Sequence, residues 1–471
     1  MNNVLMIAYF FPPTAATAAM RPLNFCRHLL GHGWAVRVLA TDHVSALPPQ
    51  SVDQKLIEAI PRNVQVIRVG HANPRGRLLQ FRERFRRLLH RDAPVRVESV
   101  SESAPPAGIA SPGQRKRLSI FQLLATWFLE FPDLQRHWYR PAIRALAELA
   151  PHDRPDVIWA TGGPWTSLLV GKNLATRWGV PFVADFRDPW IGNSLSTEMF
   201  SKRSQVLEHS VCATASRVIL NTEELRMAFC ARYPEFVHKF VTLTNGYGTD
   251  LESFYAELRE AGKVAPTSQG ASKSIELCHF GTVYGSRSPV TLFQAIEELV
   301  LVGTLKPSQL RLRFVGAWDV DDVTCERLAK RLEEREMLRR EPPIPHRQCL
   351  REMAQADLLL ILQQDFPLQI PAKIYEYIVA GRPLLVLGGE GATANLVQRH
   401  RLGRCCANNV QEIKRTVMAF LSGQIGLVAP DSADTAQFSY RALSAKLAEI
   451  LSAVCRERPS ASRSSAAATN A

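Results

Sequence analysis

Several signatures that would assign the chain to a familiar class are missing. Its 471 residues include nine cysteines, but no Cys-x-x-Cys pair occurs, and Cys405 and Cys406 are direct neighbours. An odd number of cysteines without metal-ligand spacing indicates free thiols in a reducing compartment rather than a disulfide framework. The sequence also lacks Gly-x-Gly-x-x-Gly, the fingerprint of dinucleotide-binding domains.

Long apolar runs are absent as well. No stretch of about 18 consecutive apolar residues occurs, so we expect no membrane-spanning helix. The opening MNNVLMIAYFFPP is apolar but lacks the basic region and the length of a signal peptide, and it predicts a buried first strand. We therefore expect a cytoplasmic protein, bound peripherally to the inner face of the cell membrane.

Acidic residues are too few to balance the basic ones. The chain has 57 Lys and Arg against 44 Asp and Glu, which gives a formal net charge of +13. This excess predicts an anionic partner, such as phosphate groups, acidic lipid or nucleic acid, without choosing among them. The hydrophobic fraction of 46% is ordinary for a globular protein, and the length allows two or three domains.

Short apolar runs alternate with helical patterns along most of the chain. Most of these runs are continuous rather than alternating, which is typical of parallel strands covered by helices on both faces. The pattern predicts the α/β class with parallel sheets, in which ligands bind beyond the carboxyl ends of the strands. We predict strands at Val4–Tyr9, Ala35–Ala40, Val64–Val69, Val157–Ala160, Phe182–Asp185, Arg217–Leu220, Val241–Thr244, Ile275–Phe280, Leu312–Val315, Leu358–Leu362 and Leu384–Leu387.

Shifts in composition predict the domain organisation. Residues 93–117 are rich in Pro, Ser, Ala and charge and predict a mobile loop. Residues 260–273 predict a linker between two halves of the chain. The predicted parts are an N-terminal domain at 1–259, a second domain at 274–435, a helix at 436–455 and a disordered tail at 456–471.

Three charges follow a buried strand in the segment ADFRDPW. Asp185, Arg187 and Asp188 lie where charge is unfavourable unless it is paired or used. Two carboxylates around an arginine could orient an acceptor hydroxyl or hold an anion. Alternatively, they form an ion pair that closes the loop.

Small residues follow two other strands of the first domain. The first strand runs into a loop that contains Thr14, Ala15 and Thr17, and a later one runs into Gly162 and Gly163. Small side chains let a ligand approach backbone N–H groups and a helix amino end. They equally suit tight turns, and the sequence leaves both interpretations open.

The second domain opens with a strand, a glycine and a polar loop, in LCHFGTVYGSRSP. Gly281 and Thr282 follow the strand, and Arg287 precedes a helix. This arrangement favours the approach of a phosphate group, and Arg287 is the cation that could neutralise a diphosphate. As a bare pattern it is weak, because one glycine and one arginine are common in loops.

The stretch IPAKIYEYIVAGRP carries the strongest signal. Pro371 suits the first turn of a helix, whose positive end would point into the cleft. Lys373 lies in that first turn, which is unfavourable for a cation unless an anion balances it. Glu376 follows one turn later and could accept both hydroxyls of a ribose. The alternative is an exposed helix with a surface lysine and glutamate.

Two further features have plainer interpretations. Asp319, Asp321 and Asp322 offer an Asp-x-Asp pattern, but they precede a helix, where N-capping explains them. We therefore expect no metal site there. His279 is flanked by apolar strand residues, which predicts a packed core histidine rather than a base.

Residues 75–91, RGRLLQFRERFRRLLHR, form an amphipathic cationic pattern. Its leucines and phenylalanines fall on one narrow helical face, which suits anionic lipid headgroups on the inner membrane surface. A domain helix with a solvated face is the alternative. The apolar segment 118–131 could dip into the same interface or form an acceptor wall. No aromatic-plus-basic motif supports nucleic-acid binding.

Taken together, these motifs resemble family four of the GT-B glycosyltransferases, especially bacterial members that build surface polysaccharide. FFPP, ADFRDPW, NGY, HFGTVYGSR and IPAKIYEYIVAGRP occur in the family's order over roughly residues 1–455. The resemblance implies two Rossmann-like domains facing across a cleft and a last helix, about Gln437–Val454, that crosses back to the first domain. It also implies a nucleotide-sugar donor, retention of anomeric configuration, and no metal or other cofactor.

The resemblance also implies roles for particular residues. Glu376 would bind the nucleotide ribose, and Lys373 and Arg287 would face the diphosphate. The chain departs from the family pattern at several positions. Leu368 stands where the family often has an earlier glutamate, Arg187 stands about where many members have a catalytic histidine, and Thr282 replaces a basic residue. These departures leave the donor's sugar and base open.

The sequence thus predicts a retaining transferase that moves a sugar to a lipid-linked or polysaccharide acceptor. In this hypothesis Asp185, Arg187 and Asp188 position the acceptor hydroxyl. Two alternatives stay open. A GT-B nucleotide-sugar epimerase would use soluble substrates and would not need residues 75–91. A non-catalytic polyanion-binding protein is compatible with the net charge of +13.

Overall fold

The computed structural model of the chain describes residues 2–47, 51–73, 130–191, 201–262, 264, 274–426 and 432–457. Several predicted segments therefore lie outside the described residues. They are the amphipathic stretch 75–91, the loop 93–117, the apolar segment 118–131 except its last two residues, most of the linker 260–273 and nearly all of the tail 456–471.

The first half contains a parallel sheet of seven strands in the order β3-β2-β1-β4-β5-β6-β7. Apolar side chains cover both faces of its central strands, which is why these segments form continuous buried runs. The strands are β1 (Asn2–Ile7), β2 (Trp34–Thr41), β3 (Gln65–Val69), β4 (Val157–Gly162), β5 (Phe182–Phe186), β6 (Arg217–Leu220) and β7 (Phe240–Thr242).

The second half contains a parallel sheet of six strands in the order β12-β10-β8-β13-β14-β15, and a small pair, β11-β9. Both large sheets have their first strand near the centre, as in doubly wound folds. The strands are β8 (Ile275–Phe280), β9 (Val283–Tyr284), β10 (Leu310–Val315), β11 (Trp318–Asp319), β12 (Leu338–Glu341), β13 (Leu358–Gln363), β14 (Leu384–Gly388) and β15 (Gly403–Cys406).

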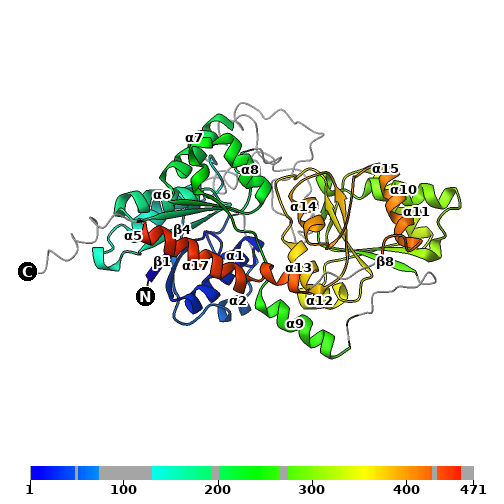
Figure 1. Ribbon diagram of the computed structural model, residues 1–471, viewed down its shortest axis with the longest axis horizontal. Helices are drawn as coiled ribbons and strands as arrows, with labels where there is room; N and C mark the ends of the chain where they lie inside the picture. The colour runs from blue at the N-terminus through cyan, green and yellow to red at the C-terminus, as the bar shows by residue number, and fades with distance from the viewer. Residues whose placement is uncertain are drawn as a thin grey trace, which may run out of the picture.

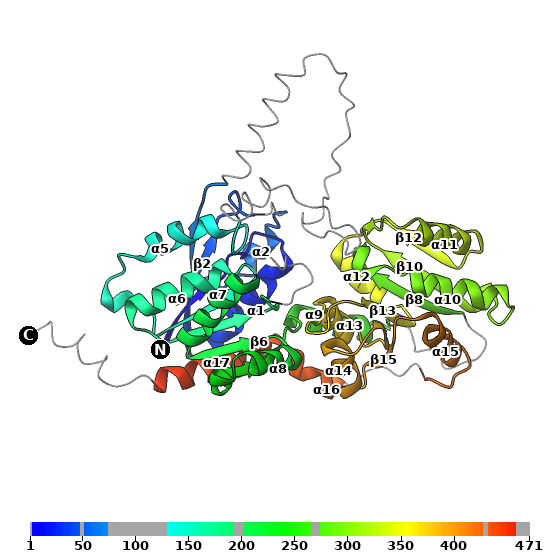
Figure 2. The same ribbon diagram turned by 90° about the horizontal axis from the view of Figure 1, so that it is seen from above.

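Helices cover both sheets, and the two halves lie side by side (Figures 1 and 2). The first half carries α1 (Thr17–Leu29), α2 (Lys55–Glu58), α5 (Tyr139–Leu146), α6 (Thr166–Trp178), α7 (Ser201–Thr214) and α8 (Glu223–Arg232). The remaining helices are α9 (Thr249–Glu260), α10 (Val290–Leu301), α11 (Val323–Glu334), α12 (His346–Met353), α13 (Lys373–Ala380), α14 (Ala392–Arg399), α15 (Val410–Leu421), α16 (Ser432–Thr435) and α17 (Tyr440–Arg456).

The predicted fold class, α/β with two facing parallel sheets, is confirmed. Every predicted strand is present within a residue or two of its expected ends. Two strands of the large sheets were missed, β12 and β15. Their sequences, LRRE and GRCC, lack an apolar run because both strands lie at a sheet edge.

The chain passes between the halves twice, first at Tyr247 and again at Phe438–Tyr440, and these two passages lie against each other. The amide of Tyr247 donates to the Phe438 carbonyl, and the amide of Tyr440 donates to the Tyr247 carbonyl. A Cβ on Gly246 would lie 2.1 Å from the Phe438 oxygen, so this close approach requires glycine in the NGY motif. The passages therefore form one compact joint.

Each passage ends in a helix that packs on the opposite half. The helix α17 returns to the first half, where Tyr440 and Leu447 join the core formed with Phe25 of α1 (Figure 1). The helix α9 packs into the core of the second half through Tyr255, although the predicted boundary at 259 assigned it to the first domain. The chain therefore enters the second half before α9.

Among the described residues, no helix combines the length and the apolar character needed to cross a membrane.

Candidate active site

The amino end of α13 lies beside the carboxyl end of β8, where the sequence predicted a phosphate site. A Cβ built on Gly281 would lie 2.2 Å from Lys373 Nζ, so the lysine side chain passes directly over this glycine. Gly281 has a φ of +132°, which only glycine adopts readily. The structure thus brings together two residues that the sequence predicted separately.

Two cations at this place lack an anionic partner. Among the described residues, no carboxylate forms an ion pair with Lys373 or Arg287, and the buried Arg287 Nε has no hydrogen-bond partner. Burial, followed by the charge of Arg287, lowers the pKa of Lys373 to about 8. Burial also lowers the pKa of Arg287, whose guanidinium lies over the rings of Tyr284 and Phe366. Uncompensated, half-buried cations are what a bound anion would balance.

Glu376 lies one turn into α13 and faces α12. Its Oε1 is 3.0 Å from Nε2 of His346, the first residue of α12. This hydrogen bond raises the pKa of His346. One carboxylate oxygen of Glu376 is therefore engaged with α12, in a contact at the surface where the Glu376 side chain is 30% exposed.

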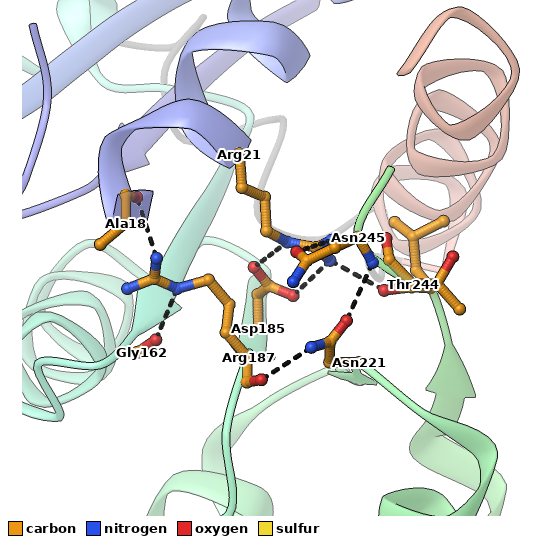
Figure 3. Close-up of polar contacts among 9 residues, drawn as sticks. Ala18, Arg21, Gly162, Asp185, Arg187, Asn221, Thr244 and Asn245 are labelled. Atoms are coloured by element: carbon orange, nitrogen blue, oxygen red, sulfur yellow. Dashed lines mark hydrogen bonds and ion pairs between the residues drawn. The ribbon is translucent and has the colours of Figure 1, made fainter. Parts of the chain in front are cut away.

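The first half presents a buried ion pair at the end of β5 (Figure 3). Arg21 of α1 donates from Nε and Nη2 to the two oxygens of Asp185, over 2.9 and 2.8 Å. The side chains are 2% and 0% exposed. Asp185 therefore does not reach the cleft, and the alternative of an ion pair that closes the loop describes it better than a role in orienting a substrate hydroxyl.

Arg187 is also committed to the protein itself. Its guanidinium donates to the carbonyls of Ala18, Gly162 and Gly163, the first two over 2.9 and 2.8 Å (Figure 3). These bonds tie the amino end of α1 to the turn between β4 and α6. Arg187 therefore positions two loops and has little capacity left to hold an anion, contrary to its expected place in the catalytic group. Gly162 and Gly163 likewise serve the turn.

Asp188 is the member of this group that faces the second half. Its Oδ1 accepts a 2.8 Å hydrogen bond from Gln369 Nε2, and burial raises its pKa. Beside it, the Thr222 hydroxyl donates to the Leu368 carbonyl over 2.8 Å, while the Leu368 side chain packs on the first core. The leucine that departs from the family pattern thus serves a contact between the halves.

The remaining predicted residues differ in their exposure. Thr14 is buried and bridges to Val52, whereas Ala15 and Thr17 are exposed at the start of α1. Thr282 is exposed next to Gly281. Burial closes Thr14 to a ligand, whereas Ala15, Thr17 and Thr282 are accessible to one.

A cavity of about 170 Å³ opens where both halves and the second passage meet. The first half contributes Thr222 and Thr244, and the second contributes Ile370 and Asn395. The space therefore adjoins the Thr222–Leu368 contact and shows that the two halves are not packed tightly against each other at this edge.

The plainer interpretations of two sequence features describe the structure well. Asp322 caps α11 by accepting from the amides of Thr324 and Cys325. His279 is 3% exposed within β8, as expected of a core histidine, although it also touches Lys373. Within the part of the chain that the structure describes, no cluster of three His, Cys, Asp or Glu side chains is arranged to hold a metal ion.

Sequence reasoning missed Arg21 and Gln369. Arg21 occupies a position of α1 with buried neighbours, and a cation there signals a buried partner that no local pattern identifies. Gln369 follows Leu368 in a loop, and its partner belongs to the other half. An arginine among the mostly apolar residues of α1 is the one signal that could have prompted a search for a buried carboxylate partner.

No protein-family model matches the sequence, and no curated protein matches it. Solved structures are similar over nearly the whole chain. HepE from Anabaena in complex with UDP is 14% identical, with a TM-score of 0.51 and coverage of 97% of this chain and 98% of that one. Sucrose-phosphate synthase from Thermosynechococcus elongatus is 13% identical, with a TM-score of 0.53 and coverage of 100% of both chains.

A third structure, OtsA in its apo form, is 13% identical, with a TM-score of 0.57 and coverage of 96% of this chain and 99% of that one. At such low identity these similarities establish the fold and no more. With its two parallel sheets facing each other and its crossing C-terminal helix, the chain has the GT-B fold.

Proposed function

We propose that this chain is a family-four glycosyltransferase that moves a sugar from a nucleotide-sugar donor to an acceptor. The observation that carries the proposal is the pair of uncompensated cations, Lys373 and Arg287, beside Gly281 at the end of β8. A diphosphate would supply the missing negative charge. When such an enzyme transfers the sugar to its acceptor, the nucleoside diphosphate is the leaving group, so these cations would mark the donor side.

On the donor side, the chain's own groups would stabilise the leaving diphosphate. The amino end of α13 contributes the positive end of its dipole, and Lys373 and Arg287 contribute full charges. Such preorganised electrostatic stabilisation is worth several kcal/mol in enzymes generally. No resident metal forms part of the proposal, because these groups provide the positive charge.

Glu376 fits the ribose of the nucleotide. Its Oε1 is bonded to His346, which leaves Oε2 to accept from a sugar hydroxyl. A glutamate one turn from the phosphate-binding end of a helix suits the separation between diphosphate and ribose. HepE has been solved with UDP and with UDP-glucose, which makes UDP the first nucleotide to test on this chain.

On the acceptor side, Asp188 would contact the incoming hydroxyl, with Arg187 and Asp185 holding its loop in place. We propose transfer with retention of configuration, in the assembly of cell-surface polysaccharide. A lipid-linked or polysaccharide acceptor would be presented at the inner membrane surface. The cationic pattern of residues 75–91 supports membrane binding from the sequence alone, since it lies outside the described residues.

A thermal-shift panel with UDP, GDP, ADP and CMP tests the donor site. A ligand present at about 100 times its Kd should add roughly 2.7 kcal/mol to the free energy of unfolding. Lys373→Met and Glu376→Ala should abolish the response. Lys330→Met is the matched control, because Lys330 is an exposed lysine of the same half.

The outcomes separate the candidate functions. Stabilisation by one nucleotide that is lost in Lys373→Met but not in Lys330→Met supports the donor site. An equal response in the wild type, Lys373→Met and Lys330→Met would place the nucleotide elsewhere. If the chain converts a nucleotide-sugar into its epimer without an acceptor, the transferase proposal is wrong and an epimerase is correct.

A further inference from the structure

His279 contacts Lys373, the lysine of the proposed donor site. It lies in β8 with 3% of its surface exposed, and its Nε2 is 3.4 Å from Lys373 Nζ. We propose that His279 is a positioning residue, a neutral acceptor that holds the Lys373 ammonium toward the diphosphate without reducing its charge. This inference rests on the proposed function.

The hydrogen bonds of His279 fix its protonation. Nδ1 lies 3.0 Å from the Leu360 carbonyl of the adjacent strand β13, and a carbonyl can only accept, so Nδ1 must carry a proton. Burial and the nearby Lys373 lower the pKa of His279 well below its ordinary value. The ring is therefore neutral, and the lone pair on Nε2 is directed at the lysine.

A neutral acceptor has a chemical advantage at this place. A carboxylate under Lys373 would orient the ammonium equally well but would also neutralise it, leaving less charge for a phosphate. The nearest carboxylate on the same helix, Glu376, is bonded to His346 instead. The lysine is thus held by contacts that leave its charge available.

The surroundings restrict the lysine to one direction. Gly281 leaves the space that the Lys373 side chain crosses, since a Cβ there would lie 2.2 Å from Nζ. Burial, and then repulsion from Arg287, lower the pKa of Lys373. The other side of the imidazole packs on Phe314, with ring centroids 5.6 Å apart. Because the ring cannot turn freely, its lone pair has a fixed direction.

Two substitutions separate the acceptor from the rest of the side chain. In His279→Asn the amide can still donate to Leu360 but is too short to reach Lys373. In His279→Gln a carbonyl oxygen can reach the lysine. We expect His279→Asn to weaken UDP binding about 2- to 12-fold, the equivalent of one hydrogen bond, and His279→Gln to restore most of the loss. Binding of uridine, which has no phosphate, should not change in either variant.

A double-mutant cycle tests whether the effect passes through the lysine. In the Lys373→Met background, His279→Asn should cause no further loss of UDP affinity. Equal losses for UDP and uridine, or an undiminished effect of His279→Asn without the lysine, would show a merely structural role and overturn the inference. If Lys373→Met weakens UDP binding and His279→Asn does not, the inference fails while the donor site stands.

A second measurement does not need a nucleotide. Nitrogen-15 NMR of histidine-labelled protein should show His279 as the neutral tautomer protonated at Nδ1 from pH 6 to 8. A signal for the tautomer protonated at Nε2, or for the charged ring, would overturn the inference even in a protein that binds no nucleotide. Absence of any nucleotide binding by the wild-type chain would instead count against the proposed function.

Discussion

Replacing Arg21 with leucine removes the cation from its buried ion pair with Asp185. Its guanidinium makes two bonds to Asp185 and also donates to the Leu243 and Thr244 carbonyls and to Asn245 Oδ1. These bonds join α1, the end of β5 and the first passage between the halves (Figure 3). The substitution would leave a carboxylate that is 0% exposed without a counter-ion.

The size of the effect follows from that burial. Breaking a buried pair by removing one partner lowers the free energy of unfolding by about 3–5 kcal/mol, because the remaining charge has lost its water and its partner. The comparison is the more exposed ion pair between Arg27, which also belongs to α1, and Asp250 of α9. Arg27 and Asp250 are 2.9 Å apart with side chains 25% and 67% exposed. Arg27→Leu should therefore lower the free energy of unfolding by about 1 kcal/mol or less.

Urea denaturation followed by tryptophan fluorescence measures these changes. Seven of the eight tryptophans precede residue 191, so the signal reports mainly on the half that contains Arg21. The double variant Arg21→Leu, Asp185→Leu should be more stable than Arg21→Leu alone, because it removes the unpaired charge. Equal losses for Arg21→Leu and Arg27→Leu would show that burial does not determine the size of the effect.

Three further predictions concern the two halves. Gly281→Ala places a Cβ 2.2 Å from Lys373 Nζ at a φ of +132°, so the UDP-induced rise in melting temperature should disappear. Because burial and then Arg287 lower the pKa of Lys373 to about 8, UDP affinity measured by titration calorimetry should fall as pH rises above 8 and the ammonium loses its proton. Burial raises the pKa of Asp133 from 3.8 to about 6. Its contribution to the free energy of unfolding should therefore be complete below pH 3.8 and lost as pH rises through 6. In urea denaturation, Asp133→Asn should lack this pH dependence.

Each of these predictions has a matched control. Gly31→Ala adds a Cβ with no other atom within 4 Å and should leave the UDP response intact. Lys373→Met should bind UDP weakly without a dependence on pH near 8. Failure would appear as full UDP stabilisation in Gly281→Ala, as unchanged wild-type affinity at pH 9, or as identical pH profiles of stability for Asp133→Asn and the wild type.

The sequence was sufficient for the fold because burial on both faces leaves a continuous apolar run. β8 and β13 were predicted for this reason. β12 carries LRRE and is held by ion pairs instead, such as Arg313 with Glu341 and Arg340 with Glu333. Long-range charge pairing leaves no periodic signal, so this edge strand was missed.

The site was partly predictable for a related reason. A lysine in the first turn of a helix conflicts with the helix dipole, and that local conflict pointed to Lys373. Asp185 showed the same kind of conflict, but its partner, Arg21, lies 164 residues away. Local reasoning thus recognises that a charge needs a partner, whereas the structure decides whether that partner is a ligand or another side chain.

The central claim is that the amino end of α13, with Lys373 and Arg287, holds the diphosphate of a nucleotide-sugar. A crystal structure of the chain with bound UDP tests it most directly. We expect phosphate oxygens within hydrogen-bond distance of Lys373 Nζ and Arg287 Nε, with the ribose hydroxyls on Glu376. A nucleotide bound away from α13, with no phosphate oxygen near Lys373 or Arg287, would contradict this placement of the donor site.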